Sequence, residues 1–417
     1  MPLSLRDRLI RIGLLAIPFG LYGWAVVVAV GAGYNGKIGP VYNALGQDWL
    51  VFYTADRAWL DGHLSHIYDQ VWLEGALNGA FGHWIKNPMS YWGFYYPPTW
   101  LLVLAPFAAL PMLWGYALTQ ALSFGGLIAA LRKTYGRSRQ FIFTALSLSL
   151  CPAASNNVLS GQNGFLTCAL FVVGFPLLEA QPILAGAFLG LASFKPQLCL
   201  MIPFALLGSR NWRAIGGAAA SALALALLSL VVFGSAFWWQ WLDLMLHPRH
   251  DVAYTGVEWG RLWDDSIYTC VRLLGASKSV ADLSQAAVTL AAGACVYFSF
   301  RRDLPHELRF VVFLAASAVA APHLSPYDMI LPALGATILV WRSFDAPFRP
   351  ILLAAPMAAW LAPIYTPPRI TPIGFAAPVA MFALIIVALR WKHRADAVVE
   401  QPRPAVAIAT LAPQQAD

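Results

Sequence analysis

The most constraining feature of this sequence is a series of long apolar runs separated by short basic clusters. Hydrophobic residues make up 59% of the 417 residues and charged residues only 11%, whereas a soluble domain carries about 25% charged residues. A chain with so few polar groups cannot cover a single water-soluble globule, and its hydrophobicity also excludes intrinsic disorder. The sequence therefore predicts an all-α polytopic membrane protein.

Apolar runs between the charged clusters predict about 12 transmembrane helices. The expected spans are residues 10–31, 112–131, 141–156, 162–178, 182–194, 197–208, 213–234, 279–300, 309–322, 327–341, 350–365 and 372–390. When the sides alternate from a cytoplasmic N-terminus, most Lys and Arg residues fall on the cytoplasmic side, as the positive-inside rule requires. We therefore expect one transmembrane domain over residues 1–394, a disordered cytoplasmic tail over 395–417, and both termini in the cytoplasm.

Two stretches admit a second interpretation. The run 10–31 follows Arg6, Arg8 and Arg11, as the apolar core of a signal peptide would, but it is long enough to cross about 30 Å of hydrocarbon. The apolar residues 95–110 resemble a span as well. They are rich in proline, and counting them as a span would invert the charge bias of everything downstream. We interpret this stretch as a juxtamembrane or re-entrant element.

Two long loops, residues 32–111 and 235–278, are predicted on the outside, and both are rich in acidic and aromatic residues. Tryptophan and tyrosine often form belts at a membrane surface. Sugar sites also combine acids with flat aromatic faces, so both interpretations stand. Nucleic-acid binding is excluded, because the basic residues lie in short clusters between apolar runs and not on one soluble face.

The first outside loop begins with an amphipathic helix, predicted over residues 47–62 from the spacing of its apolar positions. Asp48 lies at its start. It is either an N-cap, which contributes about 1 kcal/mol, or a general base held at the wall of a cavity. Asp56 and Arg57 are interpreted as a solvated surface pair.

A second group of polar residues lies near the ends of short predicted spans, where lipid would not tolerate them. Its members are Gln162, Asn163, Lys195, His323, Tyr327 and Asp328. Lys195 is either a side chain that snorkels to the outer interface or a cation that holds a phosphate. His323 and Asp328 either make structural hydrogen bonds or belong to a functional site. All of these residues are predicted at the outer face.

Nucleotide and metal chemistry are not indicated. The sequence contains no Walker A motif, no H-E-x-x-H zinc motif and no G-x-S-x-G elbow. Its five cysteines are scattered and fit neither a disulfide framework nor a zinc site. We expect no cofactor and no metal, and a lipid-linked substrate fits a site on the outer face.

An ordered series of residues resembles glycosyltransferase family 87. It consists of Asp48-x4-Tyr53, Gly62, Ile67-Tyr68-Asp69, Phe94-Tyr95-Tyr96-Pro97-Pro98, Leu110-Pro111, Gly161-Gln162-Asn163, Lys195-Pro196 and Ser325-x-Tyr327-Asp328. The resemblance implies a GT-C-type helical bundle with juxtamembrane helices in its periplasmic loops. It also implies inverting hexosyl transfer, with mannose favoured, from a polyprenyl-phosphate donor to a glycolipid or envelope glycan acceptor in a bacterial inner membrane.

The resemblance also suggests roles for individual residues. Asp48 matches the family's general base, and His323 is the nearest match to a histidine of the family's site. From their charge, Lys195 and Arg261 would stabilise the leaving phosphate. The remaining candidate substrate-binding residues are Tyr53, Tyr96, Gln162, Asn163, Tyr327 and Asp328. The main alternative function is a lipid-linked glycan flippase or transporter, although the two halves of the sequence show no repeat of the kind such proteins commonly carry.

Overall fold

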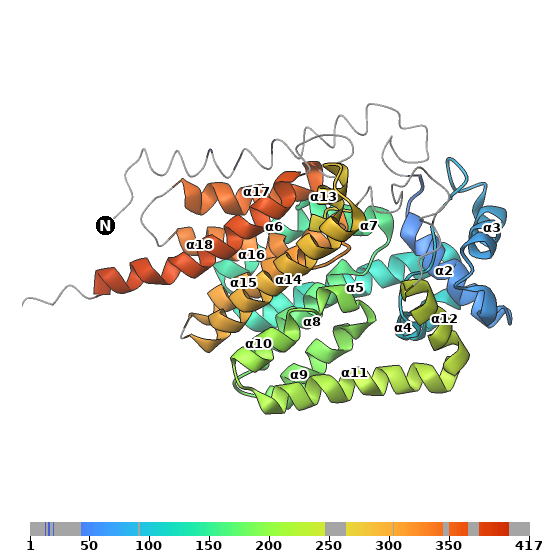
Figure 1. Ribbon diagram of the computed structural model, residues 1–417, viewed down its shortest axis with the longest axis horizontal. Coiled ribbons are helices and arrows are strands. Elements are labelled where there is room, and N and C mark those ends of the chain that lie inside the picture. The colour runs from blue at the N-terminus through green and yellow to red at the C-terminus, as the bar shows by residue number, and fades with distance from the viewer. Residues whose placement is uncertain are drawn as a thin grey trace, which may run out of the picture.

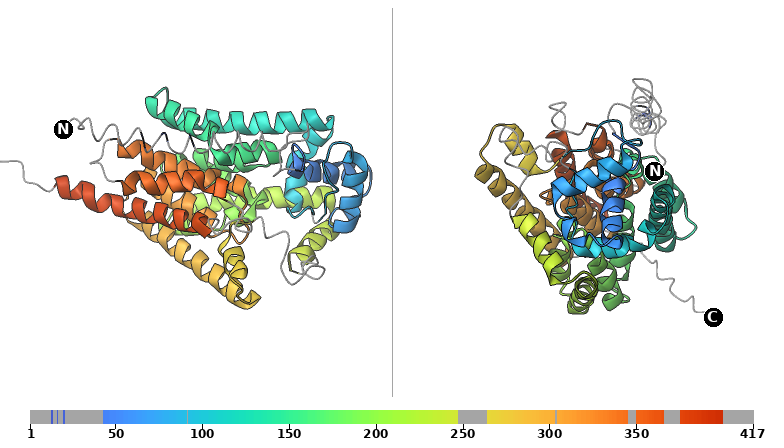
Figure 2. Two further views of the ribbon diagram at one scale, coloured as in Figure 1. Left: turned by 90° about the horizontal axis from the view of Figure 1, so that it is seen from above. Right: turned by 90° about the vertical axis from the view of Figure 1, so that its right-hand side faces the viewer.

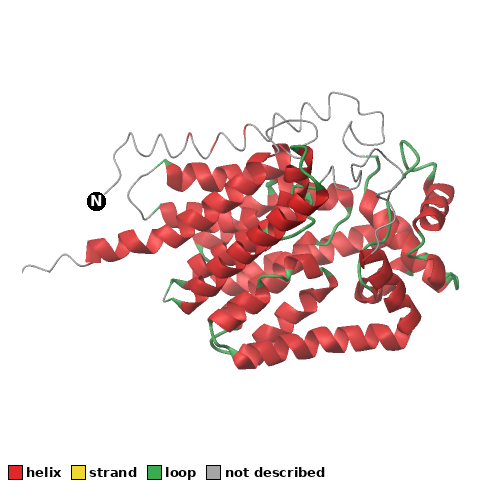
Figure 3. Cartoon of the chain, viewed as in Figure 1, coloured by secondary structure: helices red, strands yellow, loops and turns green. Residues whose placement is uncertain are grey.

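The computed structural model describes residues 43–90, 92–246, 264–302, 304–344, 350–365 and 375–399, with isolated positions 13, 16 and 20. Every regular element in these residues is a helix (Figure 3), which confirms the predicted all-α class. Apart from positions 13, 16 and 20, the predicted span 10–31 lies outside the described residues, as do much of the second outside loop and the tail beyond Val399. Arg261 does as well.

Two buried helices form the centre of the bundle, α15 (His306–Val319) and α16 (Ile330–Ser343). Nearly all of their side chains are buried, because α15 and α16 pack against each other and against neighbours on several sides. Those neighbours are α8 (Gly164–Gly174), α14 (Lys278–Arg301), α17 (Ile351–Tyr365) and α18 (Ala376–Val399). These helices therefore build one continuous apolar core.

The outer helices complete the bundle (Figure 1). They are α5 (Met112–Tyr135), α6 (Arg139–Ser149), α7 (Pro152–Ser160), α9 (Pro182–Leu191), α10 (Ile202–Gly208), α11 (Trp212–Phe233) and α13 (Ile267–Leu273). Short 3-10 turns lie between helices: η2 (Phe175–Leu177) follows α8, η3 (Ala192–Phe194) and η4 (Pro196–Leu198) lie between α9 and α10, and η7 (Pro326–Met329) precedes α16.

A layer of shorter helices covers one end of the bundle, as Figure 2 shows from above. It contains α2 (Gln47–Leu60), η1 (Leu64–His66), α3 (Gln70–Phe81), α4 (Pro98–Ala108) and α12 (Ser235–Leu246). These elements have a core of their own, in which Phe52 makes edge-to-face contacts with Phe94, Tyr96 and Trp100. The aromatic residues of the first outside loop are thus largely core residues of this terminal layer.

The number of membrane spans differs from the prediction. Among the described helices, α11 and α14 are long and apolar enough to cross a membrane, and the count rises to four if two bent helix pairs each form one span. The expectation of about 12 spans is therefore not confirmed. Most predicted spans do coincide with apolar helices, but several are short and some are broken by 3-10 turns.

The proline-rich stretch 95–110 forms α4, which is bent by 114° from the axis of α5. A bend of this size separates α4 from the direction of the following helix. It supports the interpretation of α4 as a re-entrant or juxtamembrane element. Pro97 and Pro98 begin the helix without disrupting it, because the first turn leaves its N–H groups unbonded in any case.

Helices α9 and α11 approach each other closely through glycines. A Cβ atom on Gly217 would lie 2.2 Å from the backbone oxygen of Ile183, and one on Gly186 would lie 2.0 Å from the oxygen of Ala214. Gly216, the neighbouring residue on α11, has nothing within 4 Å of an added Cβ. The packing of this pair therefore depends on which of the two adjacent glycines faces α9.

We predict opposite outcomes for two adjacent glycine-to-alanine variants. Gly217→Ala should lower the melting temperature, since the methyl group must push α9 away from α11. Gly216→Ala should preserve or raise it, because alanine in a helix interior is more favourable than glycine by about 1 kcal/mol. Thermal unfolding of both variants in one detergent would test this, and equal melting temperatures would contradict the close approach.

Candidate active site

The N-terminus of α2 lies against the end of α7 because two tight turns touch. Gly46 precedes α2 and Gly161 follows α7, and both have positive φ angles, 69° and 74°. The N–H of Gly46 donates to the carbonyl of Leu159 at 2.8 Å. A Cβ on Gly161 would lie only 2.5 Å from the Cβ of Trp49. Only glycine fits there, and the contact brings Asp48 next to Gln162.

Asp48 lies in the first turn of α2, and Gly46 occupies the N-cap position without any side-chain cap. The interpretation of Asp48 as an N-cap is therefore wrong. Its Oδ2 instead accepts a hydrogen bond of 2.9 Å from Nε2 of Gln162. Burial raises the pKa of Asp48 to about 7, against the lowering effects of the Gln162 hydrogen bond and the positive charge of Lys195. This carboxyl group can accept and release protons near neutral pH.

Gln162 connects Asp48 to two tyrosines from distant parts of the chain. Its Nε2 also donates to Oη of Tyr327 at 3.1 Å, and its Oε1 accepts from Oη of Tyr96 at 3.0 Å. Gln120 donates to the backbone oxygen of Gln162 at 2.9 Å and holds the turn in place. A single buried amide thus joins the first outside loop to the η7 turn.

Lys195 and Asp328 form a buried ion pair, with Nζ 2.5 Å from Oδ1 and both side chains only 1% exposed. Nζ also donates to Oδ1 of Asn163 at 3.0 Å and lies 4.9 Å from the ring centre of Tyr327. The snorkelling interpretation of Lys195 is therefore wrong, because its charge lies in the interior. We name this connected set the Asp48–Lys195 network. Its members are Asp48, Tyr96, Gln162, Asn163, Lys195, Tyr327 and Asp328.

His323 lies in the loop between α15 and η7, and its side chain is 48% exposed. Its Nδ1 is 3.1 Å from Oδ2 of Asp264, whose side chain is fully buried. His323 also contributes to the electrostatic environment of Asp48. The structure therefore places this histidine near the Asp48–Lys195 network, with a carboxylate partner of its own.

Three other predicted residues lie elsewhere. Tyr53 donates to the carbonyl of Leu110 at 3.0 Å and packs on Phe81, so the structure does not join it to the network. Asp56 is not a surface residue: its side chain is fully buried, and both carboxylate oxygens have no hydrogen-bond partner among the described residues. Burial raises its pKa well above the usual value. Arg57 pairs with Asp61 instead, at 3.3 Å.

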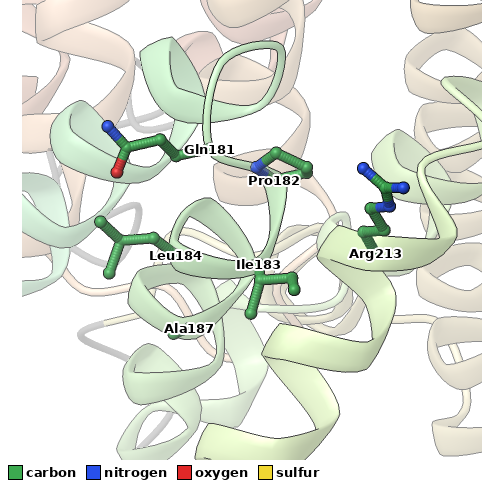
Figure 4. A pocket seen from close by; sticks show the side chains of 6 residues that line it. All are labelled: Gln181, Pro182, Ile183, Leu184, Ala187 and Arg213. Carbon is green, nitrogen blue, oxygen red and sulfur yellow. The ribbon is translucent and has the colours of Figure 1, made fainter.

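A separate pocket of about 420 Å³ lies between the starts of α9 and α11 (Figure 4). Ile183, Leu184 and Ala187 line it with apolar side chains, and Arg213 adds one positive charge. No member of the Asp48–Lys195 network lines this pocket. Within the described residues, no cluster of His, Cys, Asp or Glu is arranged to hold a metal ion.

The family model of glycosyltransferase family 87 matches residues 94–326, more than half of the chain. The chain belongs to glycosyltransferase family 87. No curated protein and no solved structure matches it.

The match to glycosyltransferase family 87 covers most of the network but not all of it. Tyr96, Gln162, Asn163 and Lys195 lie inside the matched residues, and so does His323 beside the network. Asp48 precedes the match, and Tyr327 and Asp328 follow it directly. The contacts of these three residues with Gln162 and Lys195 are thus an observation of the structure that is independent of the family match.

Sequence reasoning missed two residues of this glycosyltransferase. Asp264 was counted only as one of many acids in an outside loop, although the Asp-Asp-Ser series before α13 is typical of a helix start. Asn157 lies between the predicted spans 141–156 and 162–178 and is assigned no role from the sequence. It donates to the carbonyl of Tyr327 at 2.7 Å and accepts from the N–H of Gly164 at 2.8 Å. The available signal was the pair Asn156-Asn157 at the end of an apolar span.

We predict that Lys195→Met strongly destabilises the protein. The substitution leaves Asp328 buried without its counter-ion, and breaking a buried pair costs about 3–5 kcal/mol. Thermal unfolding in detergent would show a large fall in melting temperature. Adding Asp328→Leu to this variant should recover part of the loss.

The exposed pair of Lys278 and Asp282 provides a matched control. Lys278→Met should leave the melting temperature nearly unchanged, because exposed pairs contribute little. If Lys195→Met melted like Lys278→Met, the buried pair would not be a structural element.

Proposed function

We propose that this family 87 glycosyltransferase is a hexosyltransferase that uses a polyprenyl-phosphate sugar, with mannose favoured. The acceptor is a lipid-linked or envelope glycan, and the transfer inverts the anomeric configuration. We place the reaction at the periplasmic face of a bacterial inner membrane, in a GT-C-type bundle. Family membership supports the transfer of a sugar, and the apolar helices support a membrane location.

The observation that carries the mechanism is the environment of Asp48. A general base works best when its pKa lies near the working pH, and burial raises the pKa of Asp48 to about 7. Gln162 holds Oδ2 by a hydrogen bond. Part of the surface of Asp48 nevertheless remains exposed. Asp48 is thus both poised to accept a proton and fixed in direction.

In the proposed reaction, Asp48 takes the proton from an acceptor hydroxyl group. The hydroxyl oxygen then attacks the anomeric carbon on the face opposite the polyprenyl phosphate, and a new C–O bond forms as the bond to the phosphate oxygen breaks. The electron pair of the broken bond leaves with the phosphate. Attack from the opposite face inverts the configuration at the anomeric carbon.

The remaining members of the network set the charge of the site. Lys195 is engaged by Asn163 and Asp328, so we propose that it acts through its positive field on the donor phosphate rather than as a free ligand. The hydroxyl groups of Tyr96 and Tyr327 face Gln162 and are candidates for contacts with the sugar. Arg261 remains a candidate for the phosphate, and Tyr53 for the acceptor side of the first loop.

We predict that Asp48→Asn strongly lowers the rate of sugar transfer while the protein still folds. Asparagine keeps the shape of the side chain but cannot take a proton, and loss of a general base lowers the rate by about 10²- to 10⁴-fold. The measurement is transfer of radiolabelled mannose from polyprenyl-phosphate-mannose by purified protein in lipid nanodiscs.

Asp61→Asn is the matched control, because Asp61 is an exposed acid just after the same helix. It should transfer at the wild-type rate. Transfer that survives Asp48→Asn would keep the enzyme class and remove Asp48 as the base. Absence of transfer by the wild type, over a panel of polyprenyl-phosphate sugars and envelope lipids, would favour a transporter or flippase.

The pH dependence of transfer should report on Asp48. The base form is the carboxylate, so kcat/KM should fall about tenfold per pH unit below a pKa of about 7. The Gln162 hydrogen bond lowers this pKa, and Gln162→Leu should therefore move the acid limb to higher pH. A limb at the same pH in both proteins would assign the titration to another group.

A further inference from the structure

The side chain of Asp264 is fully buried, and each of its two carboxylate oxygens has two hydrogen-bonding contacts. Oδ1 accepts from the backbone N–H of Ser266 at 3.0 Å and from that of Leu324 at 2.6 Å. Oδ2 lies 3.2 Å from Oγ of Ser266 and 3.1 Å from Nδ1 of His323. These contacts join the residues before α13 to the loop between α15 and η7.

This arrangement favours one nitrogen of His323 as the carrier of its proton. A carboxylate has about four lone-pair positions, and the four contacts of Asp264 occupy them. Two of the donors are backbone N–H groups, and both donate to Oδ1, while the hydroxyl of Ser266 donates to Oδ2. We assign the proton of the remaining contact to Nδ1 of His323, so that Nε2 is the nitrogen that the imidazole presents to other groups.

The backbone fixes the pair as well. The N–H of Asp265 donates to the carbonyl of Leu324 at 2.8 Å, while the N–H of Leu324 donates to Asp264. Each of the two segments, 264–265 and residue 324, thus donates one hydrogen bond to the other and accepts one from it. The imidazole of His323 is held next to this double contact, although its side chain is 48% exposed.

We propose that Asp264 is the positioning residue of His323, and that the pair directs Nε2 of His323 toward the phosphate of the sugar donor. This inference rests on the proposed function. In the imidazolium form, Nε2–H donates a hydrogen bond to the phosphate oxygen that leaves with the electron pair. The proton stays on His323, the acceptor proton goes to Asp48, and the carboxylate of Asp264 balances the positive charge of the imidazolium.

The location of the pair suits this role. His323 contributes to the electrostatic environment of Asp48, and Oγ of Ser325 lies 3.4 Å from its Nε2. Among the described residues, Asp264 faces the histidine directly, and Asp48 interacts with it through the field. A base and a separate hydrogen-bond donor are the two groups that an inverting displacement uses at its two ends.

The decisive variant is Asp264→Asn. Its Oδ1 can still accept from Ser266 and Leu324, but its NH₂ group faces Nδ1 of His323 and requires Nδ1 to accept. Neutral His323 then carries its proton on Nε2. The neutral imidazole can still donate through Nε2–H, but it lacks the positive charge, and hydrogen bonds from a charged donor are roughly twice as strong as neutral ones. We expect a fall of about tenfold or more in kcat here, with little change in KM for the donor.

A double-mutant cycle separates positioning from structure. If Asp264 acts through His323, the variant that combines Asp264→Asn with His323→Gln should be no slower than His323→Gln alone, because groups that act as a unit are not additive. If the losses multiply, Asp264 acts independently of His323 and the proposal is overturned.

Ser266→Ala is the matched control for stability. It removes another contact to Oδ2 and the side-chain cap of α13, while the Asp264–His323 contact remains. It should lower the melting temperature and leave kcat within a few-fold of the wild type. Equal losses of kcat in Ser266→Ala and Asp264→Asn would reduce Asp264 to a structural role.

Nitrogen NMR of ¹⁵N-histidine-labelled protein gives a readout that does not depend on transfer. The wild type should show Nδ1 protonated at His323, assigned by the signal lost in His323→Gln, and Asp264→Asn should move the proton to Nε2. Absence of this shift would overturn the proposal. If the proton shift is observed but the wild type transfers no sugar, the proposed function and the proposed role of Nε2 at the phosphate are both overturned. The contact between Asp264 and His323 would then remain as a structural feature only.

Discussion

The candidate site depends on one buried ion pair, Lys195 with Asp328. Both charges are 1% exposed, and burying a charge is expensive unless it is paired and hydrogen-bonded. The pair therefore requires the η7 turn to stay against the loop between η3 and η4. That contact in turn fixes Tyr327, which meets Gln162 and so Asp48. A structural requirement of the interior thus orders the residues of the proposed chemistry.

Much of the site could be predicted from the sequence because polar residues in an apolar chain are rare. Gln162, Asn163, Lys195 and Asp328 stood out for this reason, and the structure joins all four into one network. The all-α class followed from the same composition. The number of spans did not follow, because hydropathy cannot tell a lipid-facing helix from a short buried one such as α16.

The residues that sequence reasoning misplaced share a physical cause. Whether an acid on an amphipathic helix meets water or the interior depends on what packs against it, and that information is tertiary. The sequence suggests that Asp56 is half of a surface pair. In the structure α2 packs against α3 and α4, and Asp56 is fully buried. Asp264 looked like one loop acid among many, and only the fold brings Leu324 and His323 to it.

Asp48 and Asp56 show how one helix can hold two desolvated acids with different capacities. Burial raises the pKa of both. Asp48 accepts a hydrogen bond from Gln162 and lies in the positive field of Lys195, so its charged form remains accessible near neutral pH. Asp56 has no hydrogen-bond partner among the described residues, so nothing offsets the cost of burying its charged form, and its pKa is raised well above the usual value. The difference in environment, and not in residue type, makes Asp48 the acid that can act as a base.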